Sequence, residues 1–169
     1  MDKKILVAYA TKYGATGGIA EKIGQTLAEQ GFKVEVKPAD QVADISTYQA
    51  VILGSGVYAG SWLKPAAELL QKNQEALAAV PVWLFSDGPT GEGDPVELMK
   101  GWSFPDALRP AAEHIRAREM VLFHGALDFN KLNFAEKFLL KAMKSPQGDY
   151  RDWEAIAAWT KTIAKTLKK

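Results

Sequence analysis

A length of 169 residues predicts one folded domain, and a composition of 47% hydrophobic and 24% charged residues excludes a disordered or collagen-like chain. The 21 basic and 20 acidic residues leave a net charge of +1, so the overall field does not indicate nucleic-acid binding. The chain has no cysteine, which excludes disulfides, thiolate catalysis and cysteine-ligated metal centres. No apolar run reaches the ~18 residues that cross a bilayer, and no signal-peptide pattern is present, so we expect a cytoplasmic protein.

Five short apolar segments have the length and composition of β-strands. The first, third and fourth are apolar at nearly every position instead of alternating with polar residues. That pattern is typical of parallel strands covered by helices on both faces. The predicted strands are Lys4–Tyr9, Lys33–Lys37, Ala50–Ser55, Val80–Phe85 and Glu119–Gly125.

Helical patterns alternate with these strands, and two of them carry clear start signals. Pro65 lies in the first turn of one helix, and Asp152 is a candidate N-cap of the last. The predicted helices are Gly17–Gln30, Lys64–Ala79, Phe104–Arg116 and Asp152–Lys168. The alternation predicts an α/β fold in which a doubly wound, five-stranded parallel sheet carries helices on both faces, within one domain over residues 1–169. Two irregular stretches stand out, Asp87–Ser103 and an insert over residues 127–150 before the last helix.

The turn after the first predicted strand has the chemistry of a phosphate site. It reads ATKYGAT over residues 10–16 and leads directly into a helix. Gly14 permits a positive φ, the helix N-terminus attracts an anion, and Thr11 and Thr16 offer hydroxyl donors. In doubly wound sheets, ligands bind outside the carboxyl ends of the strands, where this turn lies. An ordinary turn with Thr16 as the helix N-cap is the alternative interpretation.

Two further loops follow predicted strands at the same edge of the sheet. Gly54–Trp62 contains two aromatic residues, Tyr58 and Trp62, beside which a planar ring fits. This loop also loosely matches the dinucleotide-binding fingerprint, but the helix does not follow directly and the carboxylate about 20 residues further on is missing. Ser86–Gly93 is the third glycine-rich loop.

Several other kinds of site are excluded by the residues present. No Gly-Lys dipeptide occurs, which excludes a Walker A loop, and no Gly-x-Ser-x-Gly elbow occurs. The first strand ends without the clustered aspartates of a phosphoacceptor domain. His114 and His124 lack a clear third ligand, so we predict that both are structural and that the chain has no metal site.

Over nearly its whole length the chain resembles the flavodoxins. The resemblance begins with Thr11-x-x-Gly14-x-Thr16, which is similar to the loop that holds the FMN phosphate in that family. Tyr13 and Ala15 replace the Thr and Asn common in that loop. The resemblance implies the strand order 2-1-3-4-5 and a non-covalently bound FMN through which electrons are transferred.

The resemblance also implies which residues contact the cofactor. Ser55–Gly60 correspond to the loop along one side of the isoalloxazine ring, and Ser86–Pro89 correspond to the loop at its pyrimidine side. Tyr58 is the expected ring neighbour and Trp62 the alternative, with Ala59 or Gly60 facing the N5 edge. The expected cofactor-binding residues are Thr11, Lys12, Tyr13, Gly14, Ala15, Thr16, Ser55, Gly56, Val57, Tyr58, Ala59, Gly60, Ser86, Asp87, Gly88 and Pro89.

A closer resemblance is to the flavodoxin-domain branch that includes the flavodoxin-type, quinone-linked protoporphyrinogen dehydrogenase. It rests on ATKYG at residues 10–14, on Gly54-x-Gly56-Val57-Tyr58-x-Gly60, and on DYRDW at residues 149–153. Two functions therefore stay open. One is a carrier that exchanges electrons with a redox partner protein, and the other is an enzyme that oxidises a small molecule such as a porphyrinogen and reduces a quinone. The acidic surface usual in carriers is missing, which weakens the carrier, and the insert favours the enzyme.

The insert contains an amphipathic segment, Phe134–Lys144, with three lysines opposite its apolar residues. We expect the apolar face to pack on the domain, as in most helices of this kind. A basic helix at a membrane surface and a lid over an apolar substrate are the alternatives.

Overall fold

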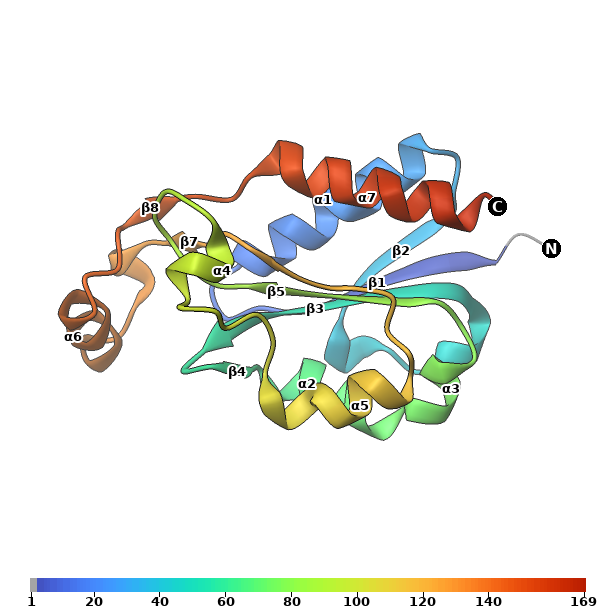
Figure 1. Ribbon diagram of the computed structural model, residues 1–169, viewed down its shortest axis with the longest axis horizontal. Helices are drawn as coiled ribbons and strands as arrows, with labels where there is room; N and C mark the ends of the chain where they lie inside the picture. Colours follow the sequence, from blue (N-terminus) through green and yellow to red (C-terminus); the bar gives the residue numbers. More distant parts are fainter. Residues whose placement is uncertain (1–2) are drawn as a thin grey trace.

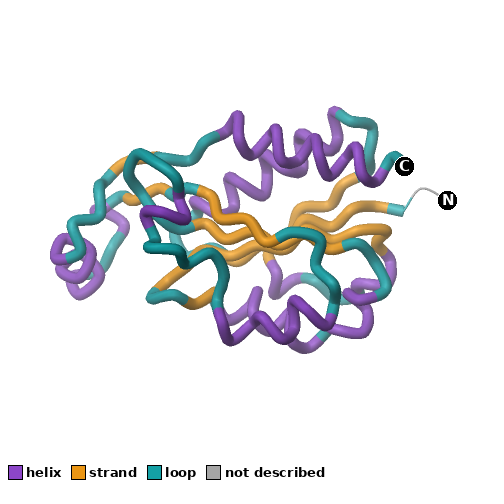
Figure 2. The backbone as a smooth tube through the Cα atoms, viewed as in Figure 1, coloured by secondary structure: helices purple, strands orange, loops and turns teal. Residues whose placement is uncertain are grey.

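A five-stranded parallel sheet between two layers of helices forms the centre of the computed structural model, which describes residues 3–169 (Figures 1 and 2). The strands lie in the order β2-β1-β3-β5-β6, and each neighbouring pair is parallel. This order confirms the flavodoxin-like topology expected from the sequence. The strands are β1 (Lys4–Ala10), β2 (Val34–Pro38), β3 (Tyr48–Tyr58), β5 (Val82–Asp87) and β6 (Met120–Phe123).

Both faces of the sheet are covered, which explains why the central strands are apolar throughout. The helices α1 (Ala15–Glu29) and α7 (Trp153–Leu167) cover one face and bury Ile5, Ile52 and Phe85. The helices α2 (Lys64–Lys72), α3 (Gln74–Ala78) and α5 (Arg109–His114) cover the other face, where Leu6 and Leu53 are buried. The three central strands β1, β3 and β5 therefore supply side chains to two separate cores.

Two predicted helices are shorter than expected. The predicted helix Lys64–Ala79 is divided at Asn73, whose backbone leaves the helical region and whose side-chain amide donates to the Leu69 carbonyl oxygen at 2.9 Å. The predicted helix Phe104–Arg116 is reduced to α5 and a preceding 3₁₀ turn. Pro110, which has no N–H to donate, lies in the first turn of α5, which begins at Arg109, so Phe104 lies before the helix.

Several short elements lie outside the predicted strands and helices. Ser61–Trp62 forms β4, which pairs antiparallel with the end of β3, and Pro95–Leu98 forms α4. At the two ends of the insert, β7 (Ala126–Leu127) and β8 (Gly148–Asp149) pair as an antiparallel ribbon. The ribbon carries α6 (Phe134–Ala142), which lies within the amphipathic segment that the sequence indicated. The 3₁₀ turns are η1 (Ala39–Gln41), η2 (Ile45–Thr47), η3 (Asp106–Leu108) and η4 (Phe129–Lys131).

The expected packing of the amphipathic segment on the domain is wrong. Phe134 is 87% exposed and Phe138 is 72% exposed. The cause is a contact between distant parts of the chain, because Glu136 on the inner side of α6 is bound to residues of the loop after β1. Within residues 3–169, no helix is long and apolar enough to cross a bilayer.

The packing of Gly54 against Phe85 predicts a measurable coupling between these two positions. A Cβ atom at Gly54 would lie 2.2–2.3 Å from atoms of the fully buried Phe85 ring. We expect Gly54→Ala to lower the free energy of unfolding by roughly 1–3 kcal/mol, as overpacking does. Urea denaturation measures the loss.

The double variant Gly54→Ala/Phe85→Leu is the control, because the smaller side chain makes room for the added methyl group. Its loss of stability should be smaller than the sum of the two single losses. Additive losses would contradict the packing argument.

Candidate functional site

The carboxyl ends of three neighbouring strands bring the predicted loops together. In the register of the sheet Ala10 pairs with Ser55, Ser55 pairs with Ser86, and Gly56 pairs with Asp87. The loops after β1, β3 and β5 therefore start side by side at one edge of the sheet. Parallel strands with this winding place a ligand crevice at that edge.

The loop after β1 enters α1 without a side-chain cap. Gly14 has a φ of 95° at the N-cap position, and its N–H donates to the Thr11 hydroxyl oxygen at 2.9 Å. No side chain caps the helix and no acidic residue lies in its first turn, whereas Asp94, Asn133 and Asp152 cap α4, α6 and α7. The N-terminus of α1 thus keeps its partial positive charge uncompensated by any side chain of its own. The alternative interpretation of Thr16 as the N-cap is wrong.

Thr16 instead joins the first loop to the third. Its buried hydroxyl donates to Oδ2 of Asp87, the last residue of β5, at 2.9 Å. The other carboxylate oxygen of Asp87 is buried without a hydrogen-bond partner. Burial raises the pKa of Asp87 to about 7, although the Thr16 hydrogen bond and Arg151 both act in the opposite direction. The Asp87 carboxyl group is therefore harder to ionise than an exposed aspartate.

The loop after β3 is a tight hairpin that presents Tyr58. Tyr58 pairs with Ser61 across a two-residue turn, and both turn residues have positive φ, 51° at Ala59 and 76° at Gly60. The Tyr58 side chain is 36% exposed, and burial of the remainder, followed by the Asp87 charge, raises its pKa to about 12. A Cβ atom at Gly56 would lie only 3.0 Å from the Tyr58 ring, so the ring packs directly over the backbone there.

Trp62 and two serines of the predicted site are buried inside the loops. The Trp62 indole N–H donates to the Ser86 hydroxyl oxygen at 2.8 Å, and its ring packs edge-on against Phe104. The Ser55 hydroxyl oxygen accepts from the Leu63 N–H at 2.9 Å. These hydrogen bonds fix the backbone of the second and third loops. Trp62 is thus a core residue, and Tyr58 is the exposed aromatic of this loop.

The remaining predicted residues lie along the same three loops. Val57 pairs with Trp62 in the hairpin, and a Cβ atom at Gly88 would lie 3.8 Å from Val57. The Gly88 N–H donates to the Phe123 carbonyl oxygen, and the Pro89 carbonyl oxygen accepts from the Gly125 N–H at 2.8 Å. The third loop is therefore held between the hairpin and the chain that leads into the insert.

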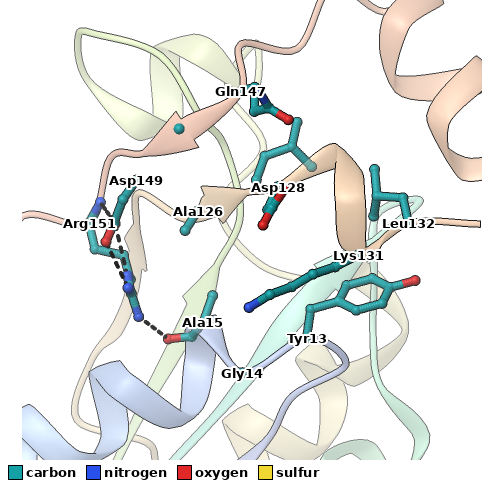
Figure 3. A pocket seen from close by; sticks show the side chains of 12 residues that line it. Tyr13, Gly14, Ala15, Ala126, Asp128, Lys131, Leu132, Gln147, Asp149 and Arg151 are labelled. Carbon is teal, nitrogen blue, oxygen red and sulfur yellow. Dashed lines mark hydrogen bonds and ion pairs between the residues drawn. The ribbon is translucent and has the colours of Figure 1, made fainter.

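A cavity of about 470 Å³ lies between the first loop and the insert (Figure 3). Of the predicted site residues, only Tyr13, Gly14 and Ala15 line it. Figure 3 shows the Asp128 and Lys131 side chains pointing into it. The lining residues that sequence reasoning missed are Ala126, Leu127, Asp128, Lys131, Leu132, Gln147, Gly148, Asp149 and Arg151.

Arg151 forms the side of the cavity next to α1. Its guanidinium donates to the Ala15 carbonyl oxygen at 3.1 Å and to the two carboxylate oxygens of Asp149 at 2.9 and 2.7 Å. The hydrogen bonds that Arg151 donates to the Asp149 carboxylate raise the pKa of Arg151. The motif DYRDW at residues 149–153, one of those that carry the family resemblance, contains Asp149 and Arg151. The motif alone does not indicate that Arg151 contacts the Ala15 carbonyl oxygen.

Glu136 binds the two long side chains of the first loop. The Lys12 ammonium lies 2.6 Å from its Oε2, and the Tyr13 hydroxyl donates to its Oε1. These two hydrogen bonds lower the pKa of Glu136 to about 2. Lys12 also lies 5.7 Å from the centre of the Tyr58 ring, so the insert, the first loop and the hairpin meet here.

Comparison with known proteins identifies the relatives of this architecture. The profile of the flavodoxin domain matches residues 6–154, and no curated protein sequence matches the chain. A flavodoxin from the domain Archaea superposes with a TM-score of 0.63 at 15% identity, covering 98% of this chain and 99% of that one. Two-electron reduced Megasphaera elsdenii flavodoxin gives 0.52 at 18% identity, covering 71% of this chain and 82% of that one.

A larger protein also contains this architecture. Rubredoxin oxygen:oxidoreductase from Desulfovibrio gigas gives a TM-score of 0.60 at 16% identity, covering 98% of this chain. This chain spans only 36% of that oxidoreductase. At these identities the structural likenesses show a shared fold.

The buried Asp87 carboxyl predicts a pH-dependent stability. Its pKa in the folded chain is about 7 against an ordinary 3.8, so the folded state binds more protons between these values and stability falls as the pH rises through them. We expect Asp87→Asn, which keeps an acceptor for Thr16, to raise the free energy of unfolding at pH 8 by up to about 4 kcal/mol. Urea denaturation at pH 4 and pH 8 measures the difference.

Asp40→Asn is the matched control, since Asp40 is exposed. It should change stability by less than about 0.5 kcal/mol at either pH. An Asp87→Asn variant that is less stable than the parent at pH 8 would show that the carboxylate is stabilising there.

Proposed function

This chain belongs to the flavodoxin domain family, and we propose that it binds FMN non-covalently and transfers electrons through the bound flavin. The observation that carries the proposal is the uncapped N-terminus of α1 at the carboxyl edge of the sheet. A bound flavin supplies the electron-accepting chemistry, and the residues of this chain bind it, orient it and exclude water.

The first loop fits the phosphate group. The backbone N–H groups at the start of α1 and the partial charge of the helix end favour an anion, and Gly14 gives the turn its positive φ. Thr11 holds the turn through its hydrogen bond to Gly14. Lys12 adds a positive charge nearby, now paired with Glu136. We infer that residues 11–16 hold the phosphate mainly through the backbone, since Thr16 is already bound to Asp87.

The second and third loops fit the flavin ring. Tyr58 offers a partly exposed aromatic face at the tip of its hairpin, and the turn at Ala59 and Gly60 holds backbone carbonyls beside it. One of these carbonyls would accept a hydrogen bond from the N5–H of the reduced ring. Ser86–Pro89, bordered by Val57, would line the pyrimidine side. Apolar and aromatic packing beside the ring disfavours added negative charge and so sets the redox potential.

A redox partner protein or a small molecule such as a quinone would exchange electrons with the bound flavin. The reduced flavodoxin among the structural neighbours supports redox chemistry on this fold. The finer assignment, a quinone-linked protoporphyrinogen dehydrogenase, rests on the motif resemblance alone. Neither the family match nor the structural neighbours name that activity, so the proposal stops at flavin-mediated electron transfer.

The role of the α1 N-terminus predicts a selective loss of FMN binding in the Ala15→Asp variant. An acidic residue at the first position of a helix is compatible with the helix dipole, so the fold should be retained. The same carboxylate would repel a phosphate dianion at this site. We expect FMN to bind at least tenfold more weakly, a change of about 1.4 kcal/mol, and riboflavin, which has no phosphate, to change less than about twofold.

Ala15→Asn provides the neutral control, because it adds nearly the same volume without a charge. Fluorescence titration with FMN and with riboflavin gives both affinities. Equal losses for the two ligands would move the phosphate away from α1 while leaving flavin binding itself intact.

The exposed ring of Tyr58 predicts a stacking contribution to flavin binding. Aromatic pairs contribute about 0.5–1.5 kcal/mol beyond burial, so Tyr58→Ala should weaken FMN binding by about three- to tenfold and increase the fluorescence of bound flavin. Tyr58→Phe keeps the ring and should behave like the parent. If Tyr58→Ala leaves affinity and fluorescence unchanged, Tyr58 is not the ring neighbour.

A further inference from the structure

The exposed surface of α6 is the most apolar among residues 3–169. Phe134 and Phe138, which are 87% and 72% exposed, form its outer face, and Leu139 and Met143, which are 55% and 66% exposed, extend the apolar surface around the helix to its C-cap. The other large apolar side chains with notable exposure, Tyr58, Leu98, Met120 and Trp153, lie between 36% and 40% and on separate elements. Scattered apolar residues are normal on protein surfaces, but four on one short helix mark an interaction site.

The attachment of α6 fixes which side of the helix faces outward. Asn133 and Glu136 form a capping box at its start, and Glu136 then reaches inward to Lys12 and Tyr13. Residues four apart share one side of a helix, so Leu140 lies on the same side as Glu136 and is partly buried. Phe134 and Phe138, also four apart, lie on the opposite side. The ion pair that holds the helix to the first loop therefore turns its apolar residues toward solvent.

Positive charge flanks this apolar face on one side. Residues 134–144 contain three lysines, Lys137, Lys141 and Lys144, and one acidic residue, Glu136, which is already bound to Lys12. The net charge of the whole chain is only +1, so positive charge is concentrated in this segment. The Lys141 ammonium lies 5.5 Å from the centre of the Phe129 ring, at the base of the helix.

We propose that the outer face of α6 docks on an anionic lipid surface. The exposed phenylalanines enter the boundary between headgroups and acyl chains, with Leu139 and Met143 beside them, while the flanking lysines remain among lipid phosphates. The helix lies at one end of the molecule, away from the end of α7 (Figure 1). A membrane can therefore meet it without contact with the helical layers. This docking is independent of flavin binding and adds a location to the proposed electron transfer.

Vesicle binding by the full chain tests the proposal. The probes are unilamellar vesicles of phosphatidylcholine alone and of phosphatidylcholine with phosphatidylglycerol, at low and high salt. We expect co-sedimentation with the anionic vesicles at low salt, at least tenfold weaker binding at high salt, and little binding to the neutral vesicles. The double variant Phe134→Ser/Phe138→Ser and the triple variant Lys137→Gln/Lys141→Gln/Lys144→Gln should each bind at least tenfold more weakly.

The triple variant Lys161→Gln/Lys165→Gln/Lys169→Gln is the matched control, because it removes the same charge from exposed lysines of α7 and the carboxyl terminus. It should bind like the parent. Equal losses in both lysine variants would overturn the proposal in favour of non-specific charge attraction. Absence of parent binding at low salt would also overturn it, as would a dimer in analytical ultracentrifugation that Phe134→Ser/Phe138→Ser dissociates, since a second copy would then cover the face.

Discussion

The buried hydrogen bond between Thr16 and Asp87 joins the first turn of α1 to the end of β5. Two glycines pack closely around it, and the space beside the one at position 125 does not admit a Cβ atom. A Cβ atom at Gly56 would lie 3.1 Å from the Thr16 hydroxyl oxygen, and one at Gly125 would lie 2.6 Å from Asp87 Oδ1. The loop after β1, the end of β3, the end of β5 and the chain just before the insert therefore all lie close to this hydrogen bond. The loop after β1 is therefore anchored to the sheet through Thr16.

The insert covers the same loop from the outside. Glu136, in the connection between β7 and β8, binds Lys12 and Tyr13, and Arg151, just after β8, binds the Ala15 carbonyl oxygen. These two residues therefore contact consecutive parts of the loop. The cavity lies between these two attachments. The contact of Glu136 with this loop also orients α6, so the same two hydrogen bonds hold the loop and turn Phe134 and Phe138 toward solvent.

The sequence predicted the parts of the fold that depend on local patterns. Apolar runs located the five central strands, and glycines with hydroxyl residues located the three loops at the carboxyl edge. The division of the second predicted helix at Asn73 depends on a side-chain hydrogen bond that competes with the helix, which a periodicity does not contain. The orientation of α6 depends on Glu136 and Lys12, which are 124 residues apart, and the helical pattern alone favoured burial. Trp62 is an aromatic residue in the expected loop and was the alternative neighbour of the flavin ring, but it is buried and its indole N–H donates to Ser86.

The position of the FMN phosphate at the N-terminus of α1 is the central claim. Phosphorus NMR of the chain loaded with FMN tests it directly. A dianion held by backbone N–H groups and the helix dipole should resist protonation, so the bound phosphate resonance should stay constant through the range around pH 6 where a free phosphate monoester titrates. A bound resonance that titrates near pH 6 would contradict the account, because the phosphate would then lie in solvent.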